Sequence, residues 1–239
     1  MAAPRPPTVR HPVMLQYWRW LTFLHWRYPP EAVQALLPAG VTVETCDGDA
    51  WVSLVPFLMD GVRVPGLPAV PPLSRFPETN VRTYVRGPDG RTGIWFFSLD
   101  ASRSPAVLTG RASYGLPYFW SSMSVRRQGV VVAYRSRRRF PGPIGAGCEV
   151  EVEMGAAWPH PPSPLDDFLT ARYTLYSRYA GRLVTADAEH PPWTLRRVAV
   201  RRLRQDLLQA AGLPAPQGEP LAHASNGVPV RISRWRHAE

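Results

Sequence analysis

The chain has 239 residues, 45% of them hydrophobic, and a formal net charge of +10. These values exclude a disordered or fibrous chain and predict a folded protein with one core. The apolar run from Val13 to Trp26 is interrupted by polar residues, and no apolar signal-peptide region precedes it, so we expect a cytoplasmic protein without membrane association.

All 28 residues counted as basic are arginines, so the only primary amine of the chain is at its N-terminus. Cys46 and Cys148 lie far apart and form no C-x-x-C pair, which predicts neither a disulfide framework nor a zinc cluster. The six histidines show none of the spacings typical of metal sites. We therefore predict no metal and no cofactor.

Residues 1–12 are rich in proline and arginine and are expected to form a mobile tail, followed by a single domain over 13–239. Alternation and turn residues predict strands over 21–28, 41–46, 50–64, 78–86, 94–100, 121–127, 130–138, 148–154, 173–187, 193–203 and 228–235. Short helices are expected over 29–38, 165–173 and 205–211. The proline-rich segment 65–77 is expected to be a long loop of the kind that often serves as a lid.

Strands outnumber helices in this pattern, the helices are short, and strands and helices do not alternate regularly. The predicted fold class is therefore mainly β (α+β): a barrel of mostly antiparallel strands with a few short peripheral helices. The strand 78–86 has the clearest alternation, with Glu78, Asn80, Arg82 and Tyr84 on one face. This polar face is the first candidate for a site.

The second candidate is the stretch Gly110–Trp120, G-R-A-S-Y-G-L-P-Y-F-W, which joins two predicted strands. Its glycines and proline fix turns, while Arg111 and Tyr118 carry polar groups on long side chains. Around Ser113 the spacing is one residue too long for the G-x-S-x-G nucleophile elbow. A serine nucleophile is therefore not predicted.

Arginine clusters at 126–127, 135–139 and 196–204 leave two interpretations open. They can bind phosphates, which makes a basic nucleic-acid-binding domain the alternative function. They can equally be solvated strand faces, and no nucleic-acid-binding motif accompanies them. We favour solvated faces and expect no specific binding to nucleic acid.

Several motifs together resemble the acetoacetate decarboxylase-like superfamily: F-P-E-T-N-V-R (76–82), F-F-S-L-D (96–100) and P-A-V-L-T-G-R-A-S-Y-G-L-P-Y-F (105–119). W-x-x-L-x-F-x-H-W (18–26) and the late H-P-P-W-x-L (190–195) are more similar still to its uncharacterised YqjF-like branch. The resemblance covers about residues 13–235 and implies the acetoacetate decarboxylase-like barrel.

This chain departs from the superfamily at the reactive residue. The decarboxylases of that superfamily form an imine on the first lysine of a Pro-Lys-Lys motif, and desolvation and a neighbouring cation lower the pKa of this lysine. Here Tyr118 and Phe119 take the two lysine positions, and Ala112 replaces the glutamate of the Gly-Arg-Glu motif. With no lysine in the chain, imine chemistry is removed.

We therefore predict a pocket for a small anionic or carbonyl-containing ligand. Glu78 and Tyr118 are the candidate catalytic residues, and the candidate binding residues are Arg27, His25, Asn80, Arg82, Tyr84 and Arg111. The resemblance implies the roles of Glu78 and Arg27. If the protein is an enzyme, it is a lysine-independent lyase or hydrolase with Glu78 as acid or base.

Simpler interpretations remain for these residues. His25 lies in an apolar run, where a histidine hydrogen-bonded in the core is the more common finding, and Glu78 can simply pair with Arg82. Tyr118 can pack in the barrel wall. A purely ligand-binding role and a homo-oligomer both stay open.

Overall fold

The computed structural model describes residues 5–71, 73–103, 110–112 and 114–238. Its strands are β1 (Pro12–Tyr28), β2 (Thr42–Val43), β3 (Thr45–Cys46), β4 (Asp49–Arg63), β5 (Phe76–Arg86), β6 (Thr92–Ala101), β7 (Tyr118–Gln128), β8 (Val131–Phe140), β9 (Gly147–Ala157), β10 (Thr174–Tyr179), β11 (Arg182–Glu189), β12 (Arg196–Gln205), β13 (Leu221–Ser233) and β14 (Arg236–His237). The short helices are α1 (Pro30–Gln34), α3 (Pro164–Thr170) and α4 (Leu207–Ala210). The predicted fold class, mainly β with a few short helices, is confirmed.

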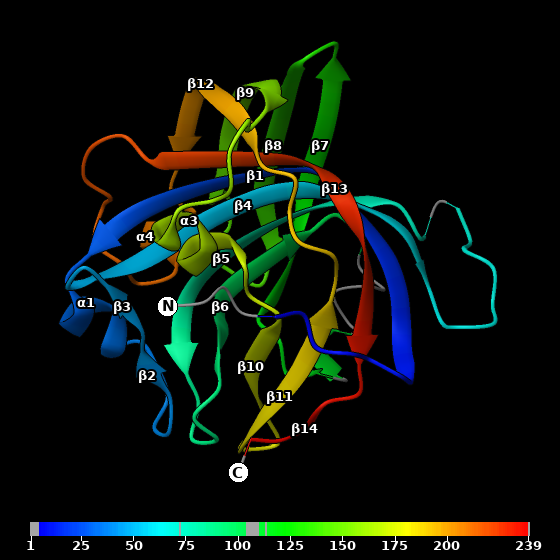
Figure 1. Ribbon diagram of the computed structural model, residues 1–239, viewed down its shortest axis with the longest axis vertical. Helices are drawn as coiled ribbons and strands as arrows, with labels where there is room; N and C mark the ends of the chain where they lie inside the picture. The colour runs from blue at the N-terminus through cyan, green and yellow to red at the C-terminus, as the bar shows by residue number, and fades with distance from the viewer. Residues whose placement is uncertain (1–4, 72, 104–109, 113, 239) are drawn as a thin grey trace.

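The strands form one mixed sheet that closes on itself twice. The first ring is β6-β7-β8-β9-β12-β13-β1-β4-β5, closed by the pairing of β5 with β6. The second ring is β6-β10-β11-β13-β1-β4-β5, closed by the pairing of β11 with β13. The five strands β13, β1, β4, β5 and β6 are therefore a wall common to both rings. Figure 1 shows β1, β4 and β13 as the long band that crosses the molecule, with β10, β11 and β14 below it.

The two rings enclose different interiors. The first holds the largest apolar cluster, in which Leu24, Leu54 and Val81 of the common wall meet Val132 of β8 and Val152 of β9. The second ring encloses a cavity. Strand β5 is buried on both faces from Glu78 to Val85, with Glu78, Asn80 and Arg82 on one face and Val81 and Val85 on the other.

Several element boundaries differ from the predictions. The expected strand 173–187 is a hairpin of two strands, β10 and β11, because Ala180 and Gly181 turn the chain with φ angles of 48° and 79°. The last long strand begins at Leu221 instead of 228, since it continues through Gly227. A side chain at Gly227 would lie 1.9 Å from the Trp18 carbonyl oxygen, so glycine here permits close strand contact.

The boundary of the expected N-terminal tail is also wrong. Val9 is buried, its amide donates to Glu189 Oε2 at 2.7 Å, and its carbonyl accepts from Arg231 at 2.7 Å. β1 then begins at Pro12. The chain is therefore fixed to the sheet three residues before its first strand.

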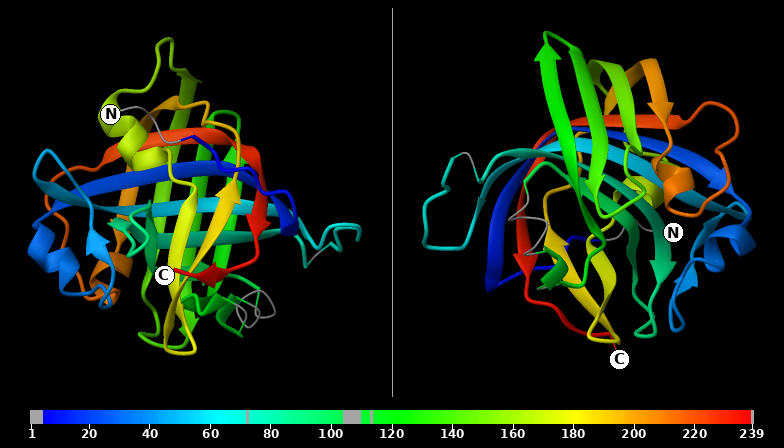
Figure 2. Two further views of the ribbon diagram at one scale, coloured as in Figure 1. Left: turned by 60° about the horizontal axis from the view of Figure 1, so that its bottom comes forward. Right: turned by 180° about the vertical axis from the view of Figure 1, so that it is seen from behind.

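The β4–β5 connection, described over 64–71 and 73–75, projects from the barrel as an arm, seen in both views of Figure 2. Val64, Leu67, Val70 and Leu73 are exposed on it, and Leu73 also borders the cavity. Its role as a lid stays a prediction.

A buried ion pair joins β6 to β8 behind the cavity wall. Arg138 donates to both carboxylate oxygens of Asp100, at 3.0 and 2.8 Å, and Ser121 donates to the same carboxylate at 2.6 Å. The guanidinium also stacks on the Phe119 ring at 3.6 Å. Both charged side chains are inaccessible to solvent, so each buried charge is neutralised by the other.

Removing one member of this pair should be severely destabilising. We expect Arg138→Met to lower the free energy of unfolding by about 3–5 kcal/mol, because it leaves the Asp100 carboxylate buried without its cation. Urea unfolding followed by tryptophan fluorescence measures the change. Arg139→Met, at the exposed neighbouring position, is the control and should shift stability by about 0.5 kcal/mol or less. Equal effects of the two substitutions would refute this role of the pair.

Candidate functional site

The second ring contains a cavity of about 300 Å³ to which all seven of its strands contribute side chains. Most of the lining is apolar and aromatic, including Trp18 of β1, Phe57 of β4, Phe76 of β5 and Trp193. A cavity of this size and character is typical of small-molecule sites.

Glu78 and Tyr118 meet in the wall of this cavity. The Tyr118 hydroxyl donates to Glu78 Oε2 at 3.1 Å, and both residues line the cavity. Two strand pairings bring them together: β5 pairs with β6 and places Asn80 beside Leu99, and β7 runs parallel to β6 with Tyr118 beside the same Leu99. The expected geometry is therefore observed, while the catalytic roles of both residues stay predictions.

The environment of Glu78 favours its neutral form. Only 3% of the residue is exposed, and this burial raises the pKa of its carboxyl to about 8, with the hydrogen bond from Tyr118 lowering it and the charge of Asp100 raising it. The pKa of Tyr118 is raised well above its ordinary value, first by burial and then by the adjacent Glu78. At neutral pH both groups are mostly protonated. A carboxyl with a pKa near 8 is suited to give and take protons at neutral pH.

Asn80 and Arg82 also line the cavity, on the same face of β5 as Glu78. Asn80 Oδ1 and Arg82 Nε are buried without a hydrogen-bond partner, and the same holds for Trp18 Nε1. Arg82 donates one long hydrogen bond, to the Leu169 carbonyl at 3.4 Å. Buried polar groups normally have partners, so these atoms are available to a ligand.

Arg27 and Arg111 do not reach the cavity, and their prediction as cavity-lining residues is wrong. Arg27 lies where β1 extends beyond the ring; its side chain is 60% exposed and pairs with Asp49 at 3.1 Å. Arg111 is exposed and donates to the Tyr118 carbonyl at 2.6 Å, so it supports the backbone of β7.

His25 and Tyr84 are also absent from the cavity lining, although both are buried. The strands that carry them pass under helix α3, whose Leu169 carbonyl accepts from the Tyr84 hydroxyl at 2.8 Å. His25 contacts Ser53 at 2.7 Å and His223 at 3.1 Å. The interpretation of His25 as a hydrogen-bonded core histidine is therefore correct. Neither His25 nor Tyr84 lines the cavity, and their role in ligand binding stays a prediction.

Part of the aromatic cavity wall consists of residues that were not among the predicted site residues. His190 lies between Tyr173 and Trp193 with its ring tilted against both, the ring centroids being 4.7 and 4.6 Å away. Burial lowers the pKa of its imidazole to about 4. Trp18 packs against Trp193 at 6.1 Å. The motifs W-x-x-L-x-F-x-H-W and H-P-P-W contain Trp18, His190 and Trp193, and they were the sequence signal from which these three residues could have been predicted.

The glycine-rich stretch before β7 has a clear structural purpose. A side chain on Gly110 would lie 2.5 Å from the Tyr118 ring, so glycine lets that ring occupy its place in the cavity wall. Gly115 has a φ of 62° and packs against the Arg178 carbonyl. Ser113 and residues 104–109 lie outside the described residues.

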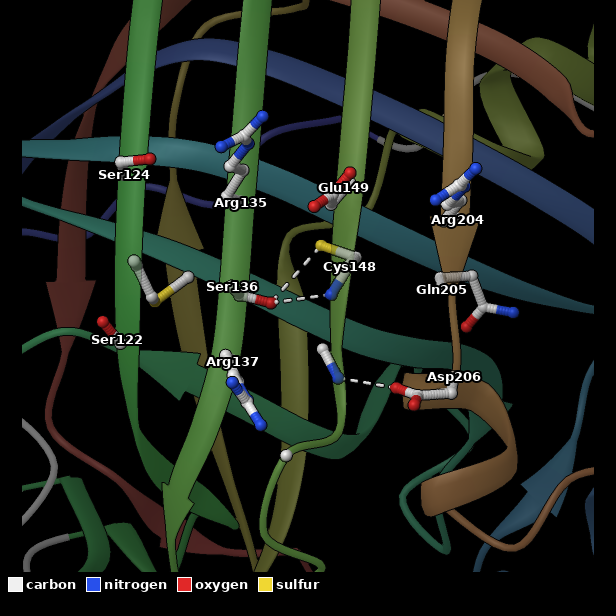
Figure 3. A pocket seen from close by; sticks show the side chains of 13 residues that line it. Ser122, Ser124, Arg135, Ser136, Arg137, Cys148, Glu149, Arg204, Gln205 and Asp206 are labelled. Atoms are coloured by element: carbon white, nitrogen blue, oxygen red, sulfur yellow. Dashed lines mark hydrogen bonds between the residues drawn. The ribbon is translucent and has the colours of Figure 1, made fainter.

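A more open groove of about 630 Å³ lies on the outer face of β7, β8, β9 and β12, where Arg135, Arg137 and Arg204 are exposed (Figure 3). Along β12, Arg201 and Arg202 pair with Glu153 and Glu149 of β9. These partly exposed ion pairs fit the interpretation of the arginine clusters as solvated strand faces.

The described residues contain no cluster of three or more His, Cys, Asp and Glu side chains arranged to hold a metal ion. Nor does any helix in that part of the chain have the length and apolar character needed to span a membrane.

The raised pKa of Glu78 makes stability depend on pH. The unfolded carboxyl ionises near 4.5 and the folded one near 8, so the folded chain holds more protons between these values and its stability falls as pH rises through them. From pH 5 to pH 9 we expect the wild-type protein to lose about 3–5 kcal/mol more unfolding free energy than Glu78→Gln does. Urea unfolding at both pH values measures this difference. The exposed variant Glu31→Gln should follow the wild type, and parallel pH profiles for Glu78→Gln and wild type would contradict the assignment.

Comparisons with known proteins agree with this architecture. The DUF2071 family, described as an uncharacterized conserved protein, matches residues 15–229. The uncharacterized protein YqjF of Bacillus subtilis (strain 168) is 34% identical over 218 residues, which cover 88% of this chain and 86% of YqjF.

Two solved structures show the same fold. An acetoacetate decarboxylase-like enzyme from Sphingomonas wittichii RW1 has a TM-score of 0.67 at 16% identity, covering 95% of this chain and 93% of the enzyme. The enduracididine biosynthesis enzyme MppR, complexed with pyruvate, has a TM-score of 0.67 at 15% identity, and the match covers 100% of this chain and 93% of MppR. The predicted resemblance is confirmed: the chain belongs to the DUF2071 family, within the YqjF-like branch, and has the acetoacetate decarboxylase-like fold.

Proposed function

We propose that the cavity binds a small compound with an apolar body and a carboxylate or carbonyl group, and that Glu78 is the acid or base of the site. The observation that carries the proposal is the buried Glu78–Tyr118 pair beside Asn80 and Arg82 in an otherwise largely apolar cavity. MppR, of the same fold, is known in complex with pyruvate, which supports a small oxygen-rich group as the recognised feature.

The charge of Arg82 favours an anionic or strongly polarised oxygen. Arg82 is 7% exposed, and among the described residues no carboxylate forms an ion pair with it. A buried cation without a counter-ion is costly, and a ligand carboxylate or carbonyl supplies the missing partner. The aromatic wall of Trp18, Phe57 and Trp193 then contacts the apolar part of the ligand.

The pair of Glu78 and Tyr118 has no imine chemistry available to it, because the chain has no lysine. A protonated Glu78 can donate a hydrogen bond or a proton to a ligand oxygen, and the Glu78 carboxylate can take one back while Tyr118 stabilises it by hydrogen bonding. These steps are acid–base chemistry on a bound carbonyl compound.

Octanoate serves as a probe with one carboxylate and one apolar chain. Isothermal titration calorimetry at neutral pH should detect its binding to the wild-type protein, and Arg82→Met should weaken that binding by about 10-fold or more, since a charge-assisted hydrogen bond is worth about 1.5–3 kcal/mol. Arg27→Met is the matched control: it removes an exposed arginine and should leave the affinity unchanged. Equal affinities for all three proteins, or no binding to wild type, would contradict the proposed site.

The absence of lysine gives a second prediction. Borohydride treatment in the presence of a 2-oxo acid should yield no covalent adduct on any internal residue, because no side-chain amine exists to form an imine. Intact-mass measurement followed by peptide mapping tests this. The N-terminal amine is distinguished by its peptide, and a stoichiometric internal adduct would overturn the proposal.

A further inference from the structure

The polar residues of the cavity form two centres that lie apart along β5. Glu78, Asn80 and Arg82 occupy alternate positions on one face of this strand, and all three line the cavity. Because a strand rises about 3.3 Å per residue, the backbone positions of Glu78 and Arg82 are about 13 Å apart. The register of β5 with β4 runs without a shift over this stretch, so β5 is fully extended between the two residues.

The side chains of the two centres do not turn toward each other. The Arg82 guanidinium donates to the Leu169 carbonyl at 3.4 Å and lies 6.0 Å from the ring of Tyr84, which is two positions further from Glu78 along β5. The Glu78 carboxyl accepts from Tyr118 at the other end of the row. The Glu78 carboxyl and the Arg82 guanidinium are therefore about 10–13 Å apart.

The two centres also act on different neighbours. Burial raises the pKa of Glu78, and the charge that raises it further is that of Asp100. Burial lowers the pKa of His190, and the charge that lowers it further is that of Arg82. A charge shifts the pKa of groups that lie close to it, so this pattern agrees with the separation derived from the strand geometry.

The cavity wall between the two centres is mostly apolar. Val55 of β4 and Leu99 of β6 are the partners of Asn80 in the sheet, and both line the cavity. Asn80 itself carries Oδ1 without a hydrogen-bond partner. A ligand that reaches from one centre to the other therefore places an apolar segment against Val55 and Leu99.

The chemistry of each centre assigns one end of such a ligand. Tyr118 donates to Glu78 Oε2, which leaves Oε1 to carry the proton of the neutral carboxyl and to donate it in a hydrogen bond. This centre suits an uncharged acceptor, such as a carbonyl or hydroxyl oxygen. Arg82 is a buried cation, and it suits a carboxylate.

The separation of the centres sets the spacing of the two ligand groups. Hydrogen bonds of about 2.9 Å at each end leave about 4–7 Å between the two ligand oxygens. An extended chain advances about 1.2 Å per bond, so about four to six bonds separate the groups. A 2-oxo acid has its carbonyl next to its carboxylate and is too short to reach both centres.

We propose that the ligand is a carboxylate with a second polar oxygen, a carbonyl or hydroxyl, about four to six bonds away along an apolar chain. Arg82 binds the carboxylate, and Glu78 binds the distant oxygen and carries out the acid–base chemistry there. This inference rests on the proposed function and names the substrate class of that site.

Two isomeric ligands test the inference by isothermal titration calorimetry at neutral pH, with octanoate as the reference. The carbonyl of 6-oxooctanoate lies within the expected range, whereas that of 2-oxooctanoate adjoins the carboxylate. We expect the wild-type protein to bind 6-oxooctanoate about 3–10-fold more tightly than octanoate, because its carbonyl gains a hydrogen bond from Glu78. It should also bind 6-oxooctanoate more tightly than 2-oxooctanoate.

Three variants separate the two centres. Glu78→Met removes the donor and should abolish the advantage of 6-oxooctanoate over octanoate, while the affinity for 2-oxooctanoate relative to octanoate stays as in the wild type. Arg82→Met should weaken the binding of octanoate and 6-oxooctanoate alike, by about 10-fold or more, and keep their ratio. Glu31→Met, at an exposed position, is the control and should leave all affinities unchanged.

Octanoate that binds as tightly as 6-oxooctanoate, or an advantage of 6-oxooctanoate that persists in Glu78→Met, would overturn the inference and leave the proposed function intact. Failure of all three compounds to bind the wild-type protein would refute the proposed function and this inference together. If Glu78→Met does not fold, the affinities of the two isomers for the wild-type protein decide, and a preference for 2-oxooctanoate would contradict the inference.

Discussion

The arrangement of this protein depends on strand β5 being buried on both faces. Val81 on one face belongs to the apolar core of the first ring, and Glu78, Asn80 and Arg82 on the other face line the cavity of the second. A strand in such a wall cannot expose its polar face to water. The polar groups must find partners inside the protein or in a ligand, and their unfilled hydrogen-bonding capacity supports the proposal that the cavity binds a ligand.

The same burial separates this chain chemically from enzymes that share its fold. Where the decarboxylase motif has a lysine, β7 carries Tyr118, and its hydroxyl reaches Glu78 directly. A neutral pair of carboxyl and phenol replaces a cationic amine. Tyr118 lies in the cavity wall, and in the proposed function it takes part in acid–base chemistry in place of nucleophilic chemistry. The likeness to those structures shows the fold alone.

Much of this could be read from the sequence, and the failures have physical reasons. Alternation along 78–86 and the G-R-A-S-Y-G-L-P-Y-F-W stretch located Glu78 and Tyr118, because period-two patterning and turn glycines are local signals. Tyr84 lies outside the cavity lining, since alternation gives the face of a strand and not how far along the strand the cavity extends. Arg27 was expected at the site from the family resemblance, and it lies outside the lining as well. The pairing of β11 with β13 that closes the second ring is non-local, and no pattern within either strand encodes it.

The central claim is that Glu78 is a mostly neutral carboxyl in the wall of a ligand cavity. Carbon-13 NMR of the Glu78 carboxyl across a pH series, assigned by its loss in Glu78→Gln, tests this most directly. The account predicts a midpoint at about pH 8, far above the ordinary value of 4.5. A midpoint near 4.5 would show a solvated or ion-paired carboxylate and would contradict it.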